Sequence, residues 1–332
     1  MADEITGGGP AKQMGADGQL TPEQTARKEE IKANIHWTDM QALLQYGVGV
    51  QRKIAGCLET ILAQMQNSDS VHAGDLMQEL AQKIKDTAAD QPEEGIFDRI
   101  LFFKKGRRMR QKMARRYEIL EVQMDRMEQE LEQVRMRILK DIILLDGLYE
   151  KNMESYQDLQ VYIAAGEEKL DELQNHTLQN LRGEAADQRN PMKAQAVREL
   201  EDVGNRLEQK LHDLKLSRAI ALQAALQIRM IQNHDKMLAD KIQMEVLGTI
   251  PLWKGRIAMA LGLHRQAEAA GESKQGTVDL ETLNKGNAEF IAVMEEAIAI
   301  QKKNHAAHQK AEQELAGMEQ KFEKPLPTFS KQ

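Results

Sequence analysis

The chain has 332 residues, of which 29% are charged and only 4% are aromatic, and its formal net charge is −7. The acidic balance disfavours a general nucleic-acid-binding protein. A single cysteine, Cys57, excludes an internal disulfide, a thiolate-rich metal site and a dithiol redox centre. Strong helix formers dominate, and eighteen methionines fill apolar positions. We therefore expect an all-α fold: an elongated antiparallel coiled-coil bundle with a small N-terminal helical unit.

The N-terminal part of the chain contains a Gly-rich stretch followed by helix signals. Residues 1–30 are expected to form a disordered tail, although Thr21, Pro22 and Gln24 are typical of a helix start with a capping box. No apolar segment has the features of a signal peptide, and no run reaches about 18 apolar residues. We expect a cytoplasmic protein, with peripheral contact at the inner face of the membrane left open.

Two short helices, at about 38–66 and 70–88, are expected to form the N-terminal unit, residues 31–95. A heptad pattern of apolar residues follows and predicts one long helix over about 108–183. The residues that carry this pattern are Met113, Tyr117, Leu120, Met124, Met127, Leu131, Val134, Ile138, Leu145 and Leu148, with Asp141 and Asn152 at seam positions. Polar residues in such a seam more often fix its register than bind a ligand.

The rest of the chain is expected to complete a bundle over residues 96–322. A nine-residue connection at 183–191 predicts an antiparallel return by a helix at about 192–247. A loop at 269–276 precedes a last helix at about 278–322, and residues 323–332 form a tail.

Residues 96–116 combine aromatic and basic side chains. The segment holds Phe102 and Phe103, followed by Lys104, Lys105, Arg107, Arg108, Arg110, Lys112, Arg115 and Arg116. These residues would suit contact with an anionic membrane, or the binding of an anion. A third interpretation, a buried Phe knob beside a solvated charged face, also stays open.

A second polar strip lies at 216–233, where Arg218, Gln223, Gln227, Arg229 and Gln232 gather. It could cradle an anion, or satisfy Asp141 and Asn152 across the seam.

The sequence lacks nucleotide-binding, nucleophile-elbow and metal motifs, so we expect no catalytic residue, no metal and no cofactor. His305 and His308 are expected to be solvated. Cys57 is expected to be a small buried apolar residue.

The stretch TIPLWKGRIAMALGL, residues 249–263, interrupts the polar helix pattern. Thr249 and Pro251 predict a corner and a new short helix at about 251–264. This apolar element, with Trp253, would close the end of the bundle, or else contact a membrane or a partner.

Several segments resemble the toxic anion resistance (TelA) family. Ile250, Pro251, Leu252, Trp253 and Lys254 resemble the family signature. The stretches LYEKN at 148–152 and IAAGE at 163–167, and the Gln-rich stretch at 214–243, are also similar to family segments. Family members often have proline where Leu226 stands. A helix kink at this position is therefore expected less strongly for this chain than for those members.

The resemblance implies resistance to tellurite and related oxyanions. We expect a non-enzymatic helical protein within a stress-response or envelope-protecting assembly, acting through protein or membrane contacts. The alternative is an anion-binding protein that sequesters oxyanions at its basic segment. Protein partners are expected, nucleic acid is not, and a homo-oligomer stays open.

Overall fold

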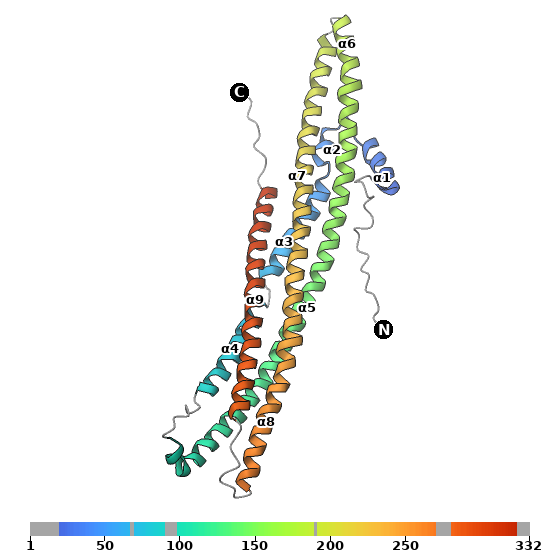
Figure 1. Ribbon diagram of the computed structural model, residues 1–332. Coiled ribbons are helices and arrows are strands. Elements are labelled where there is room, and N and C mark those ends of the chain that lie inside the picture. Colours follow the sequence, from blue (N-terminus) through green and yellow to red (C-terminus); the bar gives the residue numbers. More distant parts are fainter. Residues whose placement is uncertain (1–19, 67–69, 90–97, 189–190, 270–279, 324–332) are drawn as a thin grey trace. The chain divides into compact units, whose positions relative to one another are not determined.

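The computed structural model describes residues 20–66, 70–89, 98–188, 191–269 and 280–323. Within these ranges every regular element is a helix, so the expected all-α bundle is confirmed (Figure 1). The helices form two compact units. The first unit contains residues up to Gln64, Leu145–Arg229 and residues from Glu312, and the second contains Met65–Leu144 and Met230–Ala311. The expected separation of an N-terminal unit, 31–95, from a bundle, 96–322, stays a prediction.

The first unit begins with α1 (Pro22–Ala33), which takes in residues 22–30 of the expected tail. The predicted capping box is present: the Thr21 side chain accepts from the Gln24 backbone N–H, and the Gln24 side chain accepts from the Thr21 N–H. Both bonds satisfy N–H groups that lack partners inside the helix. The expected helix 38–66 is instead two helices, α2 (Met40–Gln45) and α3 (Val48–Gln66).

Gly47 separates α2 from α3. Its φ of 68° lies in the left-handed region that side chains disfavour. A Cβ at this position would also stand 2.6 Å from Leu214 Cδ2. The glycine therefore serves both the backbone turn and the close packing of this turn on α7 (Pro191–Lys241).

The long helices of the first unit extend beyond the predicted limits. The helix α5 (Asp98–Glu172) starts ten residues earlier than expected and continues through a π-helical turn, Leu173–Thr177, into α6 (Leu178–Gln188). The expected nine-residue connection is therefore wrong, since helix is described over residues 183–188 and again from Pro191. Ion pairs join Arg182 to Glu201 and Lys193 to Glu184, so α6 and α7 run antiparallel as predicted.

The second unit has one continuous apolar core. It includes α4 (Ser70–Ala89), the first half of α5, the end of α7, α8 (Gly248–Ala269) and α9 (Leu280–Glu323). The heptad residues Tyr117, Leu120, Met124, Met127, Leu131, Val134 and Ile138 all lie in this core, which confirms the predicted seam from Tyr117 to Ile138. Met113 lies outside the residues whose side chains are described.

The predicted seam is wrong at Asp141. Asp141 is only half-buried, whereas its neighbour Ile142 is 5% exposed and takes the core position. The heptad spacing resumes at the buried Leu145 and Leu148. A straight helix drifts relative to a strict seven-residue repeat, so a one-residue shift restores the apolar contact.

The predicted corner at Pro251 is also wrong. A π-helical turn, Ile242–Leu247, leads directly into α8, and Pro251 lies inside that helix. Proline lacks the N–H that would bond four residues back, and its ring crowds the carbonyl there. The wider π turn changes the hydrogen-bond ladder just before this position, which lets the helix continue.

Candidate functional site

The predicted basic segment begins α5, but most of its side chains lie outside the described residues. This applies to Phe102, Phe103, Lys104, Lys105, Arg107, Arg108, Arg110 and Lys112. Their backbone is helical from Asp98, and Arg115 and Arg116 are described and exposed. Membrane or anion contact by this segment stays a prediction.

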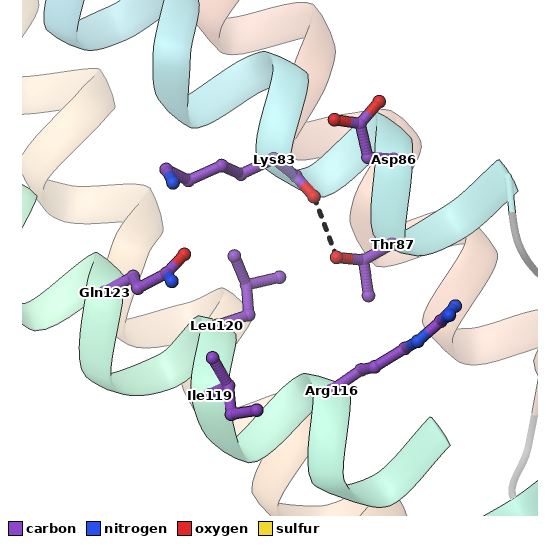
Figure 2. Close-up of a pocket in the computed structure, with 7 residues that line it drawn as sticks. All are labelled: Lys83, Asp86, Thr87, Arg116, Ile119, Leu120 and Gln123. Atoms are coloured by element: carbon purple, nitrogen blue, oxygen red, sulfur yellow. Dashed lines mark hydrogen bonds between the residues drawn. The ribbon is translucent and has the colours of Figure 1, made fainter. Parts of the chain in front are cut away.

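A pocket lies at the described end of the segment. Figure 2 shows α4 contributing Lys83, Asp86 and Thr87, and α5 contributing Arg116, Ile119, Leu120 and Gln123. Its volume is about 290 Å³. The Lys83 and Arg116 side chains extend in different directions in Figure 2, and the Thr87 hydroxyl donates to the Lys83 carbonyl at 2.8 Å. The two cations therefore do not converge on one anion position, and Asp86 would oppose an anion there.

The family-like signature, Ile250–Lys254, lies partly in the core and partly at the surface of the second unit. Ile250 and Trp253 are buried, with 0% and 2% of their surface exposed. Pro251 and Leu252 face outward, and Leu252 is 67% exposed. Lys254 is half-buried. The signature therefore contributes one face to the core and one to the surface.

A chain of buried hydrogen bonds holds Trp253. Its indole Nε1–H donates to Asn287 Oδ1 at 2.8 Å, and Asn287 Nδ2–H donates to Tyr117 Oη at 3.2 Å. The Tyr117 and Trp253 ring centroids are 6.4 Å apart, and the Trp253 and Phe290 ring centroids are 6.0 Å apart. The bonds join α8, α9 and α5 and satisfy polar groups that would be costly to bury alone. The same bonds connect the signature to Tyr117, the residue that follows Arg116.

The cation of the signature, Lys254, and the nearby Arg256 are paired within the chain. Lys254 donates to Asp125 and, at 2.5 Å, to Glu128. Burial lowers the pKa of Lys254, but its hydrogen bonds to Asp125 and Glu128 outweigh burial and raise the pKa overall. Arg256 forms an ion pair with Glu289 at 2.5 Å. Both positive charges are therefore already engaged by carboxylates.

The polar strip at 216–233 meets Asn152 through its backbone, and anion binding by the strip stays a prediction. Asn152, which is fully buried, donates to the backbone carbonyl of Ala221 at 2.7 Å rather than to a side chain of the strip. Arg229 pairs with Asp146 at 2.7 Å and lies over the Tyr149 ring. Gln227 donates to Glu314.

The prediction that His308 is solvated is wrong. His308 is 6% exposed, and its Nε2 lies 2.9 Å from Asp235 Oδ1. Asn304 Nδ2 donates to the same oxygen at 3.0 Å, and Asn304 is fully buried. Gln232, also buried, donates to the Ile142 carbonyl at 3.1 Å.

Sequence reasoning missed this polar layer between α7 and α9. The available signal was the spacing of Gln301, Asn304 and His308 on one face of a helix.

Cys57 is buried, as expected, and its Sγ lies 3.4 Å from the Leu148 carbonyl oxygen. Burial raises the pKa of its thiol to about 11, with Lys151 opposing the shift. Such a thiol is a poor nucleophile at neutral pH.

The described residues contain neither a cluster of metal ligands nor a membrane-spanning helix. No group of three or more His, Cys, Asp or Glu side chains is arranged to hold a metal ion in that part of the chain. Nor does any helix described there combine the length and apolar character needed to span a bilayer.

Comparisons with known proteins agree with the residues that suggested a family. The profile of the family described as toxic anion resistance protein (TelA) matches residues 28–275 and 267–328. A TelA-like protein of Staphylococcus haemolyticus is 31% identical over 344 residues, covering 95% of this chain and 88% of the relative. Uncharacterized proteins of Listeria monocytogenes and Bacillus subtilis are each 32% identical, covering 92% and 93% of this chain and 84% and 89% of their own lengths. No solved structure matches the chain.

Proposed function

Because the chain belongs to the toxic anion resistance (TelA) family, we propose that it supports resistance to oxyanions such as tellurite without catalysing a reaction. It acts through contacts of its surface with proteins, or with an anionic membrane, as part of a stress-response or envelope-protecting assembly in the cytoplasm. The basic segment, Lys104–Arg116, with Phe102 and Phe103, is the proposed contact surface.

The observation that carries this proposal is the state of the cations outside the basic segment. Arg229, Lys254 and Arg256, which an anion-binding core would need, pair with carboxylates of the same chain. An anion that displaced the carboxylates from these three cations would leave the carboxylates without their partners, which costs free energy. The basic segment stands out by its sequence: eight basic residues lie within thirteen positions that hold no acidic residue. A run of this kind suits an extended anionic or acidic surface.

Vesicle flotation tests the membrane form of this proposal. Wild type and a Phe102→Ser, Phe103→Ser variant would be compared on phosphatidylserine vesicles and on neutral vesicles, at low and high salt. We expect wild type to float with the anionic vesicles at low salt only, and the variant to lose this binding. Equal flotation of both proteins would exclude the aromatic side chains as the anchor, and no flotation of wild type would restrict the proposal to protein partners.

The alternative function is sequestration of oxyanions at the basic segment. The run of eight basic residues without an acidic one favours it. The pocket beside Arg116 does not, because Asp86 lines it and Lys83 and Arg116 extend in different directions. Calorimetric titration of the full chain with tellurite decides between the two functions. We expect no saturable heat, while a saturable signal that is lost in an Arg115→Gln, Arg116→Gln variant would favour sequestration.

A further inference from the structure

One outward face of α5 combines exposed aliphatic side chains with arginines. Ile119 and Val122 are 59% and 70% exposed, and they lie about one helical turn apart. Arg115 precedes Ile119 by four residues, Arg126 follows Val122 by four, and both arginines are exposed. Residues at intervals of three and four share one face of a helix. We call Arg115, Ile119, Val122 and Arg126 the α5 face.

The α5 face does not contribute to the core of the second unit. The core positions of this stretch are Tyr117, Leu120 and Met124, each at most 3% exposed. Isoleucine and valine also form helices less readily than alanine or leucine, so helix formation does not account for Ile119 and Val122. Both side chains would gain free energy from a surface that removes them from water.

The basic segment continues the α5 face toward the start of the helix. Lys104 and Arg108 precede Arg115 by eleven and seven residues within α5, and these intervals return to the same face. Residues 104–126 together hold nine basic and three acidic residues. One of the three acidic residues, Asp125, is bound by Lys254. An excess of positive charge therefore adjoins the aliphatic pair.

Two carboxylates lie close to the α5 face. Glu130 forms an ion pair with Arg126 at 2.9 Å, yet the Arg126 side chain stays 82% exposed. Glu118 follows Arg115 by three residues, at the edge of the face. These two carboxylates offset the two arginines of the face locally, so the positive excess comes from the basic segment that precedes it.

An anionic membrane suits this combination of side chains. A helix that lies in the membrane interface buries its apolar side chains at the acyl boundary, while its cations attract the anionic headgroups. Arginine can lay its apolar stem beside such side chains and extend its guanidinium to a lipid phosphate. The aliphatic side chains of the α5 face are large, which suits a surface whose gain depends on the area buried.

We propose that the α5 face lies along the surface of an anionic membrane, with Ile119 and Val122 as its apolar contacts. This inference rests on the membrane form of the proposed function and extends it. The contact surface then continues beyond Arg116 to Arg126, and α5 lies along the membrane over this length.

Vesicle flotation of the full chain tests the inference with a matched pair of double variants. Ile119→Ser, Val122→Ser removes the apolar contacts. Leu252→Ser, Met259→Ser is the control, because these two side chains are 67% and 68% exposed on α8. All four positions are exposed, so each variant should stay folded. We expect wild type and control to bind phosphatidylserine vesicles at low salt, and the Ile119→Ser, Val122→Ser variant to bind at least about tenfold more weakly.

A polarity-sensitive dye gives a second measurement that keeps the apolar pair largely intact. The dye would be attached at Val122→Cys, or at Met259→Cys as the control, while the buried Cys57 is protected from labelling. We expect phosphatidylserine vesicles to shift the emission to shorter wavelength for the dye at position 122 only.

The outcomes separate this inference from the proposed function. Membrane binding by wild type that is unchanged in the Ile119→Ser, Val122→Ser variant would overturn the inference and leave the proposed function standing. Equal emission shifts at positions 122 and 259 would also overturn it. No binding of wild type would overturn the inference together with the membrane form of the proposed function, and would leave the α5 face to a protein partner.

Discussion

At the scale of single residues, Trp253 shows why a polar helix carries an apolar signature. Its ring fills the core of the second unit, and its N–H completes a hydrogen-bonded chain through Asn287 to Tyr117. The adjacent Leu252 takes no part in this core. Two neighbouring residues of one motif therefore have different physical roles, one in folding and one at the surface.

We expect Trp253→Phe to destabilise the protein. The change keeps an aromatic ring but removes the N–H, so the buried Asn287 Oδ1 loses its donor. The expected loss is about 1–3 kcal/mol in the free energy of unfolding, measured by urea denaturation. Leu252→Ala is the control, with an expected change within about 0.5 kcal/mol because its side chain is exposed. A larger effect at Leu252 than at Trp253 would contradict this assignment.

Cys57 gives a second residue-scale prediction. Because burial raises the pKa of its thiol to about 11, little reactive thiolate exists near pH 8 in the folded protein. We expect a disulfide reagent to react on the order of 100-fold more slowly with folded than with urea-unfolded protein. The native rate should increase as pH rises. Equal rates in the two states would mean that the thiol is accessible.

At the scale of helices, α1 depends on charge rather than on apolar packing. None of its residues is buried. Its side chains pair with α5 through Arg27 to Asp158, Lys28 to Glu168, and Lys32 to both Glu168 and Glu172. Ion pairs at a surface weaken as salt screens them.

We therefore expect α1 to detach in high salt while the rest of the first unit stays folded. Hydrogen exchange of residues 22–33 should accelerate at about 1 M salt, where the screening length is about 3 Å. Exchange in α9 is the internal control. Unchanged exchange in α1 would show that contacts other than ion pairs retain it.

Acid should release the same helix. Hydrogen bonds from Lys28 and Lys32 lower the pKa of Glu168, and a hydrogen bond from Lys32 lowers that of Glu172. Groups whose pKa is lower in the folded state stabilise it above their ordinary pKa of 4.5, and this contribution is lost as pH falls through the lowered values. Proteolysis by pepsin should therefore reach α1 before the other helices as pH falls.

At the scale of the molecule, the sequence predicted the helical class, the antiparallel pairing and the described heptad core. These follow from apolar spacing, which the core enforces. The sequence indicates the π turn before α8 only weakly. The signal is that the buried residues Leu238, Ile242, Val246 and Ile250 follow one another at intervals of four positions. A repeated step of four residues is longer than the α-helical repeat of 3.6 residues, and it suits a wider helical turn. Pro251, however, suggested that the helix ends there.

The buried pair of His308 and Asp235 could not be predicted in the same way. The two residues are 73 positions apart, and a histidine on a charged helix is usually solvated. Only the packing of α9 on α7 brings the two residues together. The basic segment remains the part of the candidate site that rests on sequence, because most of its side chains lie outside the described residues.

If a contact surface rather than a reaction underlies the proposed resistance, growth on tellurite should depend on Phe102 and Phe103. The most direct measurement is growth on tellurite of a bacterial strain that lacks its own TelA-family gene, complemented with wild type or with the Phe102→Ser, Phe103→Ser variant at equal protein levels. We expect wild type to restore growth and the variant, although folded by circular dichroism, not to restore it. Full restoration by the variant would contradict it.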